Sequence, residues 1–283
     1  MTKTLRLALI LLAASVALHA DALHFDSVSG TWGGITFAPD TYNGPYYISP
    51  YFGSTSTSGG YVLFCIDFDH TIYLPDQEAS TVFQTLTTAT FDSAPHLQFG
   101  AITNGAGTDN YVSGPLPTGA NIDTLNSLQR YEAAMFLLNQ ELVLLQNPPA
   151  DNARVRAVYQ YAIWALFLQN GVGSPGSEGS AAYSGAIASI QSADQKFEAD
   201  VNNLILSAVN VTGQYNPATQ DWLLSQFTVV DATTNPNSSL GGEYQEFLHP
   251  NFTLAPAPEP GSIMLLGTVF AGVAWLIRRK RVG

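Results

Sequence analysis

The sequence predicts an α+β fold, an antiparallel β-sandwich or barrel with a helical insertion, from three observations. Residues 23–120 are rich in Tyr, Phe, Thr, Val, Gly and Pro, in short alternating runs broken by turn residues, which is typical of antiparallel strands. Over 121–210 the spacing of apolar residues changes to three or four, which indicates helices. Strand-like sequence returns over 211–254. Because the two kinds of element are segregated along the chain, we expect the helices to pack on one side or end of the sheet.

The predicted strands follow from alternation of apolar and polar residues between turn signals. In chain order they cover 23–28, 33–38, 45–52, 61–69, 71–74, 80–87, 222–231, 242–248 and 252–254. Residues 54–60 read as a loop, and the Gly- and Pro-rich sequences at 104–107 and 114–117 predict a connection to the helices.

The predicted helices follow from apolar stripes between helix-ending residues. The first ends before Pro148-Pro149, and its stripe is Leu125, Leu128, Tyr131, Met135, Leu138, Leu142 and Leu145. The second begins near Asp151-Asn152, either of which can cap it, and extends to Asn170-Gly171. Residues 171–180 form a predicted loop, and 181–209 predict one longer or two shorter helices.

The N-terminus has the organisation of a secretory signal peptide, assigned to residues 1–22. Lys3 and Arg6 form a basic region, and an almost wholly apolar run follows over residues 7–18. The small residues at Ala20 and Ala22 suit cleavage after Ala22, with cleavage after Ala20 as the alternative. The sequence therefore predicts export, with residues 23–254 as the body.

The C-terminus predicts a membrane anchor. Residues 262–277 contain an unbroken apolar run, and the basic cluster Arg278, Arg279, Lys280 and Arg281 follows it in the tail 278–283. Basic residues at this edge place the tail in the cytoplasm and the body outside. Before processing, the chain is thus predicted to cross the inner membrane once.

A Pro-rich linker, residues 255–261, precedes this helix and is expected to stay extended and exposed. Its residues Pro258, Glu259 and Pro260, followed by a short apolar helix and a basic cluster, resemble the PEP-CTERM sorting signal of exported proteins of Gram-negative bacteria. The resemblance implies recognition by an exosortase-type membrane transpeptidase, removal of the tail, and delivery to the cell surface or an exopolysaccharide matrix. The resemblance concerns where the protein is delivered and leaves the activity of the body open.

The charge of the body argues against a nucleic-acid partner. Between residues 21 and 257 there are 21 acidic residues, and only Arg130, Arg154, Arg156 and Lys196 are basic, so the net charge of this region is −17. Such a surface repels phosphate backbones.

Cys65 is the only cysteine of this predicted exported chain, and secreted proteins normally pair their cysteines. Side chains alternate along the predicted strand 61–69, so Val62, Phe64 and Ile66 share a core face while Leu63 and Cys65 share the other. Because Leu63 must be covered, we expect the helical insertion to pack over the face that carries Cys65.

Gln160 lies in an otherwise apolar helical segment, where an amide is costly to bury unless it is paired. The segments 64–67 (Phe-Cys-Ile-Asp) and 159–164 (Tyr-Gln-Tyr-Ala-Ile-Trp) resemble the thioester domains of bacterial surface adhesins. Those domains contain aromatic-Cys-apolar-Asp and Thr-Gln-x-Ala-Ile-Trp segments, and this chain has Tyr159 in place of Thr.

The resemblance implies an internal thioester between Cys65 and Gln160, with Phe64, Asp67 and Trp164 in its environment. Attack by an amine of a partner, an unidentified surface protein or polysaccharide, would open the bond and leave an amide cross-link. The reaction needs no cofactor and occurs once, so the chain is predicted not to be an enzyme.

Other interpretations remain open. Cys65 can be a buried hydrophobe and Gln160 a hydrogen-bonded helix residue, in a non-covalent structural or glycan-binding matrix protein with an inactive thioester-like fold. A cysteine hydrolase is less favoured for two reasons. Asp67 opposes formation of the Cys65 thiolate, and no catalytic motif surrounds His70, His96 or His249. No metal site is predicted, since the acidic pairs at 67–69 and 76–78 lack the rest of a calcium loop.

Overall fold

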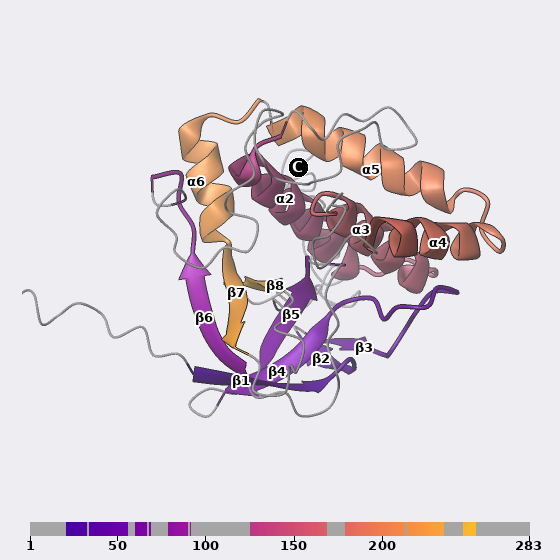
Figure 1. Ribbon diagram of the computed structural model, residues 1–283, viewed down its shortest axis with the longest axis horizontal. Helices are drawn as coiled ribbons and strands as arrows, with labels where there is room; N and C mark the ends of the chain where they lie inside the picture. The colour runs from indigo at the N-terminus through magenta and orange to yellow at the C-terminus, as the bar shows by residue number, and fades with distance from the viewer. Residues whose placement is uncertain are drawn as a thin grey trace, which may run out of the picture.

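A computed structural model shows how the elements are arranged (Figure 1). It describes residues 21–32, 34–55, 60–66, 68, 79–89, 91, 125–168, 179–212, 214–234 and 246–252. Several predictions lie outside these residues: the signal peptide up to residue 20, the strand 71–74, the connection at 104–117, the linker, the membrane helix 262–277 and the basic tail. Within the described ranges, no helix has both the length and the apolar character needed to cross a bilayer.

Six strands form one curled antiparallel sheet in the order β1-β4-β5-β8-β7-β6. Because β1 pairs with both β4 and β6, the ring of strands closes. Two further short strands, β2 and β3, form a separate hairpin. The bounds are β1 Asp21–Ser27, β2 Gly30–Trp32, β3 Ile35–Phe37, β4 Tyr51–Thr55, β5 Tyr61–Cys65, β6 Ala79–Thr85, β7 Phe227–Thr234 and β8 Glu246–Pro250.

Five helices lie among the described residues, and in Figure 1 α2 to α5 are gathered at one end of the sheet while α6 leads into β7. The α+β class and the helical insertion are therefore confirmed. The bounds are α2 Ser127–Leu145, α3 Asn152–Ala165, α4 Gly179–Gln191, α5 Phe197–Thr212 and α6 Pro217–Ser225. The stretch predicted as one longer or two shorter helices forms two.

The start of α2 shows why a helix begins there. The side chain of Asn126 accepts from the backbone N–H of Gln129, and the Gln129 side chain accepts in return from the backbone of Asn126. This capping box satisfies two N–H groups that the helix itself leaves without partners. The apolar stripe behind it is buried as predicted, except that Leu128 is only partly buried.

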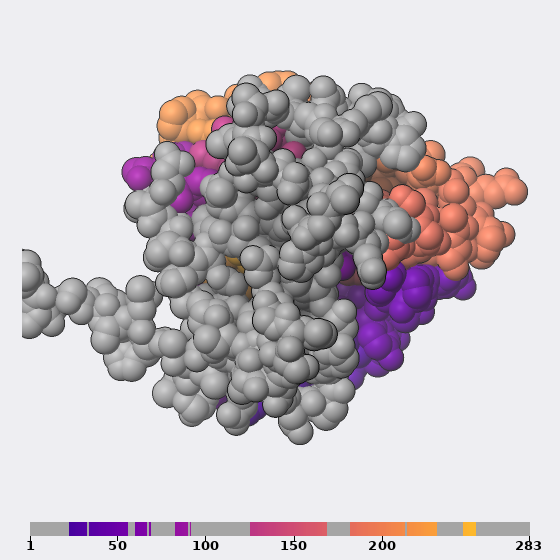
Figure 2. Space-filling view, viewed as in Figure 1, coloured from indigo at the N-terminus to yellow at the C-terminus, as the bar shows by residue number. Residues whose placement is uncertain are grey.

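The predicted strand 45–52 is wrong before residue 51. Residues 41–50 form turns and bends, with Tyr42 and Asn43 at positive φ values of 41° and 61°. The backbone N–H of Ile48 donates to the Asp40 carbonyl at 2.9 Å, and the groups of Ser49 bond to side chains of α3, so neither residue joins a ladder. Figure 2 shows this region, in violet, directly beside the surface of α4.

The predicted strand 222–231 is wrong in its first part, because α6 extends through residue 225 and β7 starts only at 227. The Asn216 side chain accepts from the Thr219 N–H at 3.0 Å, and Pro217 occupies the first turn, where its missing N–H costs nothing. These capping residues, with Leu223 and Leu224 buried on one side, favour a helical turn over the local β-propensity.

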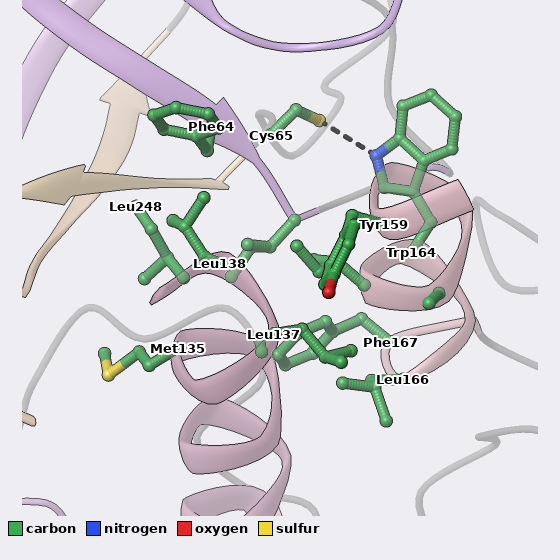
Figure 3. Close-up of a cluster of buried hydrophobic side chains, with 14 of the residues drawn as sticks. Phe64, Cys65, Met135, Leu137, Leu138, Tyr159, Trp164, Leu166, Phe167 and Leu248 are labelled. Carbon is green, nitrogen blue, oxygen red and sulfur yellow. Dashed lines mark hydrogen bonds between the residues drawn. The ribbon is translucent and has the colours of Figure 1, made fainter. Parts of the chain in front are cut away.

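The core spans the inside of the closed sheet and the contact between sheet and helices. Within the sheet, the ring of Phe247 lies 5.2 Å from that of Phe25 and 5.9 Å from that of Tyr51. On the helical side, Leu137, Leu138 and Phe167 fill the space between α2 and α3 below the end of β5 (Figure 3). The end of β5 therefore lies where the two parts of the core meet.

Candidate functional site

Cys65 is the last residue of β5 and is fully buried. Its backbone N–H donates to Ser49 Oγ at 3.0 Å. The indole Nε1 of Trp164, on α3, donates to the Cys65 sulfur at 3.4 Å (Figure 3). Trp164 of the helical insertion thus covers the Cys65 sulfur, as predicted, whereas Leu63 on the same face pairs with Tyr51 of β4 and lies inside the closed sheet.

Gln160 lies on α3 and is 2% exposed. Its amide nitrogen Nε2 donates to the backbone carbonyl of Cys65 at 2.7 Å, across 95 residues of sequence. Its oxygen Oε1 accepts from the backbone N–H of Ser49 at 3.2 Å. Since both ends of the amide are engaged, its plane is held in one orientation beside Cys65.

Ser49 is held in place by the guanidinium of Arg156. Arg156 Nε and one terminal nitrogen donate to the Ser49 carbonyl at 3.1 and 2.7 Å, and the same terminal nitrogen reaches the Ile48 carbonyl at 3.4 Å. The guanidinium also lies over the ring of Phe37, with its carbon 5.3 Å from the ring centroid. Arg156 and Gln160 are four residues apart on α3, so they project from the same face of the helix.

Arg156 is buried together with an acidic partner, Glu141 of α2. Burial lowers the pKa of Arg156, and the nearby Glu141 and Asp40 oppose this change. Burial also raises the pKa of Glu141 to about 8, with Arg156 opposing the shift. Loss of solvation outweighs the attraction between the two charges, so Glu141 is largely protonated at neutral pH.

We therefore expect the stability of the fold to decrease as the pH rises from about 4.5, the ordinary pKa of Glu141, to about 8. In this window the unfolded chain has lost the Glu141 proton while the folded chain retains it, so proton release favours unfolding. Glu141→Gln, which cannot ionise, should have a flatter profile of melting temperature against pH. The measurement is thermal unfolding at several pH values. Identical slopes for the two proteins would contradict the prediction.

The remaining predicted site residues are placed differently. Phe64 is buried, but its ring packs edge-on against Trp32 with centroids 6.3 Å apart, because its side chain projects from the opposite face of β5 to that of Cys65. Asp67 lies outside the described residues. Tyr159, at the position where the adhesin pattern has Thr, places its hydroxyl 3.4 Å from Gln140 Oε1 of α2.

A row of aromatic rings connects Trp164 to the surface. The ring of Phe68 lies 5.0 Å from Trp164, and Tyr46 lies 4.8 Å from Phe68, both edge-on. Tyr46 is 36% exposed, whereas Trp164 is 3% exposed. The rings therefore separate the Cys65 sulfur from solvent on this side.

The structure also bears on the alternative chemistries. The Nδ1 atom of His249, on β8, lies 2.9 Å from the Val62 carbonyl, and the His249 ring packs edge-on against Tyr61. Burial lowers the pKa of His249. Across the described part of the chain, no group of three or more His, Cys, Asp or Glu side chains is arranged to hold a metal ion.

Sequence reasoning missed Ser49 and Arg156. A signal for Arg156 was present, because it is one of only four basic residues between 21 and 257 and lies one helical turn before Gln160. A weaker signal for Ser49 was Pro50, which cannot donate to a ladder and so argues against a regular strand at that point.

Comparison with known proteins identifies one segment of the chain. A family model described as the PEP-CTERM protein-sorting motif matches residues 256–280, which include Pro258, Glu259, Pro260 and most of the basic cluster. No curated protein and no solved structure matches the chain. The motif is the recognition signal for exosortase, a membrane processing enzyme, and implies transient anchoring at the membrane. The chain therefore carries a PEP-CTERM sorting motif, the mark of an exported protein that is sorted by exosortase.

Proposed function

We propose that this protein is a cell-surface or matrix protein whose body forms an internal thioester between Cys65 and Gln160 and attaches covalently to amines of a partner. The sorting motif delivers the body outside the cell, where such a bond can meet a surface protein or polysaccharide that carries amino groups. The proposed role is adhesion, with each molecule reacting once.

The observation that carries the proposal is the hydrogen bond from Gln160 Nε2 to the Cys65 carbonyl at 2.7 Å, within a buried site. A buried amide needs partners, but any backbone group can supply them. Here the partner is the one cysteine of the chain, although β5 and α3 are far apart in sequence. The contact holds the amide beside the residue whose sulfur would attack it.

The chemistry balances without a cofactor. The Cys65 sulfur bonds to the side-chain carbonyl carbon of Gln160, the carbon–nitrogen bond breaks, and the thiol proton leaves with the nitrogen as ammonia. A partner amine then attacks the same carbon. The sulfur departs, the amine proton returns to it, and an amide cross-link remains at residue 160.

A thioester persists only where water is kept away, and the buried position of Cys65 supports this requirement. The Trp164 N–H on the sulfur and the rings of Phe68 and Tyr46 form the covered side of the site. An incoming amine would have to displace these rings, which provides a route for selecting partners by shape.

Intact mass spectrometry of the full chain tests the proposal. The expected mass is lower than that of the sequence by one ammonia, and incubation with methylamine should add one methylamine to this form. Cys65→Ser and Gln160→Glu should abolish both changes. Gln140→Glu, which alters an amide on the neighbouring helix, should leave both intact.

An unmodified mass, together with a Cys65 thiol that alkylates freely after unfolding, would overturn the covalent proposal. The protein would then be a non-covalent structural or glycan-binding component with the same sorting motif.

A further inference from the structure

The hydrogen bonds around Ser49 assign it a chemical role in the same site. We propose that the backbone N–H of Ser49 is the oxyanion donor for thioester formation and opening at Gln160, and that Arg156 is the positioning residue that holds it there. This inference rests on the proposed function.

The first argument is the location of developing charge. When the Cys65 sulfur attacks the Gln160 carbonyl carbon, negative charge develops on Oε1. Ser49 N–H already donates to this atom at 3.2 Å. A donor that is in place before the reaction stabilises the tetrahedral intermediate without reorganisation, and its effect is larger in a buried site than in water.

The second argument is the hydrogen bond at the nitrogen end of the Gln160 amide. Gln160 Nε2 donates to the Cys65 carbonyl at 2.7 Å, so the atom that must leave is held by an acceptor. As this nitrogen takes the thiol proton and gains positive character, the carbonyl stabilises it. The two hydrogen bonds thus act on the two atoms whose charges change, the oxygen through Ser49 and the nitrogen through Cys65.

The third argument is the way Ser49 is held. Its N–H bonds to Gln160, its Oγ accepts from the Cys65 N–H at 3.0 Å, and its carbonyl accepts two bonds from Arg156. All four residues are buried. Ser49 therefore binds both reacting residues, which fixes their relative positions as an effective oxyanion site requires.

Arg156 also acts on the donating peptide itself. The N–H of Ser49 belongs to the same peptide group as the carbonyl of Ile48, and an Arg156 nitrogen lies 3.4 Å from that carbonyl oxygen. A cation at the oxygen end polarises the peptide and strengthens the hydrogen bond donated at the nitrogen end. A neutral side chain at position 156 would remove both the clamp and the polarisation.

The experiment compares Arg156→Met and Arg156→Lys with the wild-type full chain in detergent. The rate of methylamine uptake is measured by intact mass and divided by the fraction of molecules that carry the thioester. We expect Arg156→Met to lower this normalised rate by roughly 10- to 100-fold, at or below the range for loss of one oxyanion donor. Arg156→Lys should recover part of it, because an ammonium can still reach a carbonyl.

A second measurement separates a chemical role from a structural one. In a protein labelled with ¹³C-glutamine, the thioester carbonyl carbon resonates well downfield of amide carbons in the NMR spectrum. The chemical shift of this carbon depends on the hydrogen bond to the carbonyl oxygen. Arg156→Met should shift this resonance upfield. Arg154→Lys is the matched control, because Arg154 lies two residues earlier on α3 and bonds instead to Asp194 and Asp200. It should change neither the rate nor the shift.

The outcomes are distinct. If the wild type has a thioester and Arg156→Met matches its normalised rate and carbon shift, the inference is overturned while the proposed function stands. If the wild type has no thioester, both fail. If Arg156→Met does not fold, the normalised rates of Arg156→Lys and Ser49→Ala test the inference instead. Ser49→Ala keeps the donating N–H but loses the bond to the Cys65 N–H, and Arg156→Lys keeps a cation but loses the planar guanidinium, so both should show intermediate rates. Wild-type rates in both variants would overturn the inference.

Discussion

A chain that lacks residues 258–260 is expected to keep its C-terminal tail and to accumulate in the membrane fraction. These residues are the Pro-Glu-Pro core of the segment matched as a PEP-CTERM protein-sorting motif. The apolar run and the basic cluster that follow are predicted to hold the tail at the membrane, but the processing enzyme would lose its recognition signal. The effect should be close to all-or-none, since recognition of a short segment depends on a few side chains.

The measurement is the intact mass of the protein recovered from the membrane and from the cell surface. Deletion of residues 253–255 is the matched control, because it shortens the chain equally but lies outside the matched residues 256–280. The control should be processed like the wild type. Unchanged processing of the 258–260 deletion would show that these three residues are not the recognition signal.

Phe247→Ala is expected to destabilise the fold by about 3–5 kcal/mol, the range for removing a large aromatic side chain from a packed core. Phe247 is 1% exposed and packs against Phe25 and Tyr51. Phe247, on β8, pairs with Cys65 of β5 on one side and with Val230 of β7 on the other. The cavity would therefore lie inside the closed sheet, beside the strand that carries Cys65.

Urea unfolding followed by tryptophan fluorescence measures this change. The control is Trp222→Ala, because Trp222 is 56% exposed and its removal should alter the free energy of unfolding by no more than about 0.5 kcal/mol. A loss for Phe247→Ala as small as that of the control would mean that Phe247 does not pack inside the sheet. If the proposed thioester forms, its fraction should fall in this variant, because β5 would be held less firmly.

The sequence was most informative where periodicity and local signals decide structure. The stripe of α2 was predictable, because burial of one face imposes a spacing that neighbouring residues display. The alternation of β5 correctly separated Phe64 from Cys65, although both faces of this strand are buried. The predictions failed at 45–50 and at 222–225, where the same residue types suit more than one structure. At 222–225 a helix cap upstream decided the outcome. At 45–50 the decision came from α3, more than a hundred residues away.

Some residues of the candidate site could likewise be found from the sequence, and others only from the structure. The sequence by itself determined the sorting motif and singled out Cys65 and Gln160, because these depend on which residues occur and in what order. Only the tertiary structure added Ser49 and Arg156 and packed the Phe64 ring against Trp32. The physical reason is that Ser49 contributes mainly through its backbone, which every non-proline residue possesses, so no residue pattern marks it. Its partners Gln160 and Arg156 lie 111 and 107 residues away, and only folding brings them together.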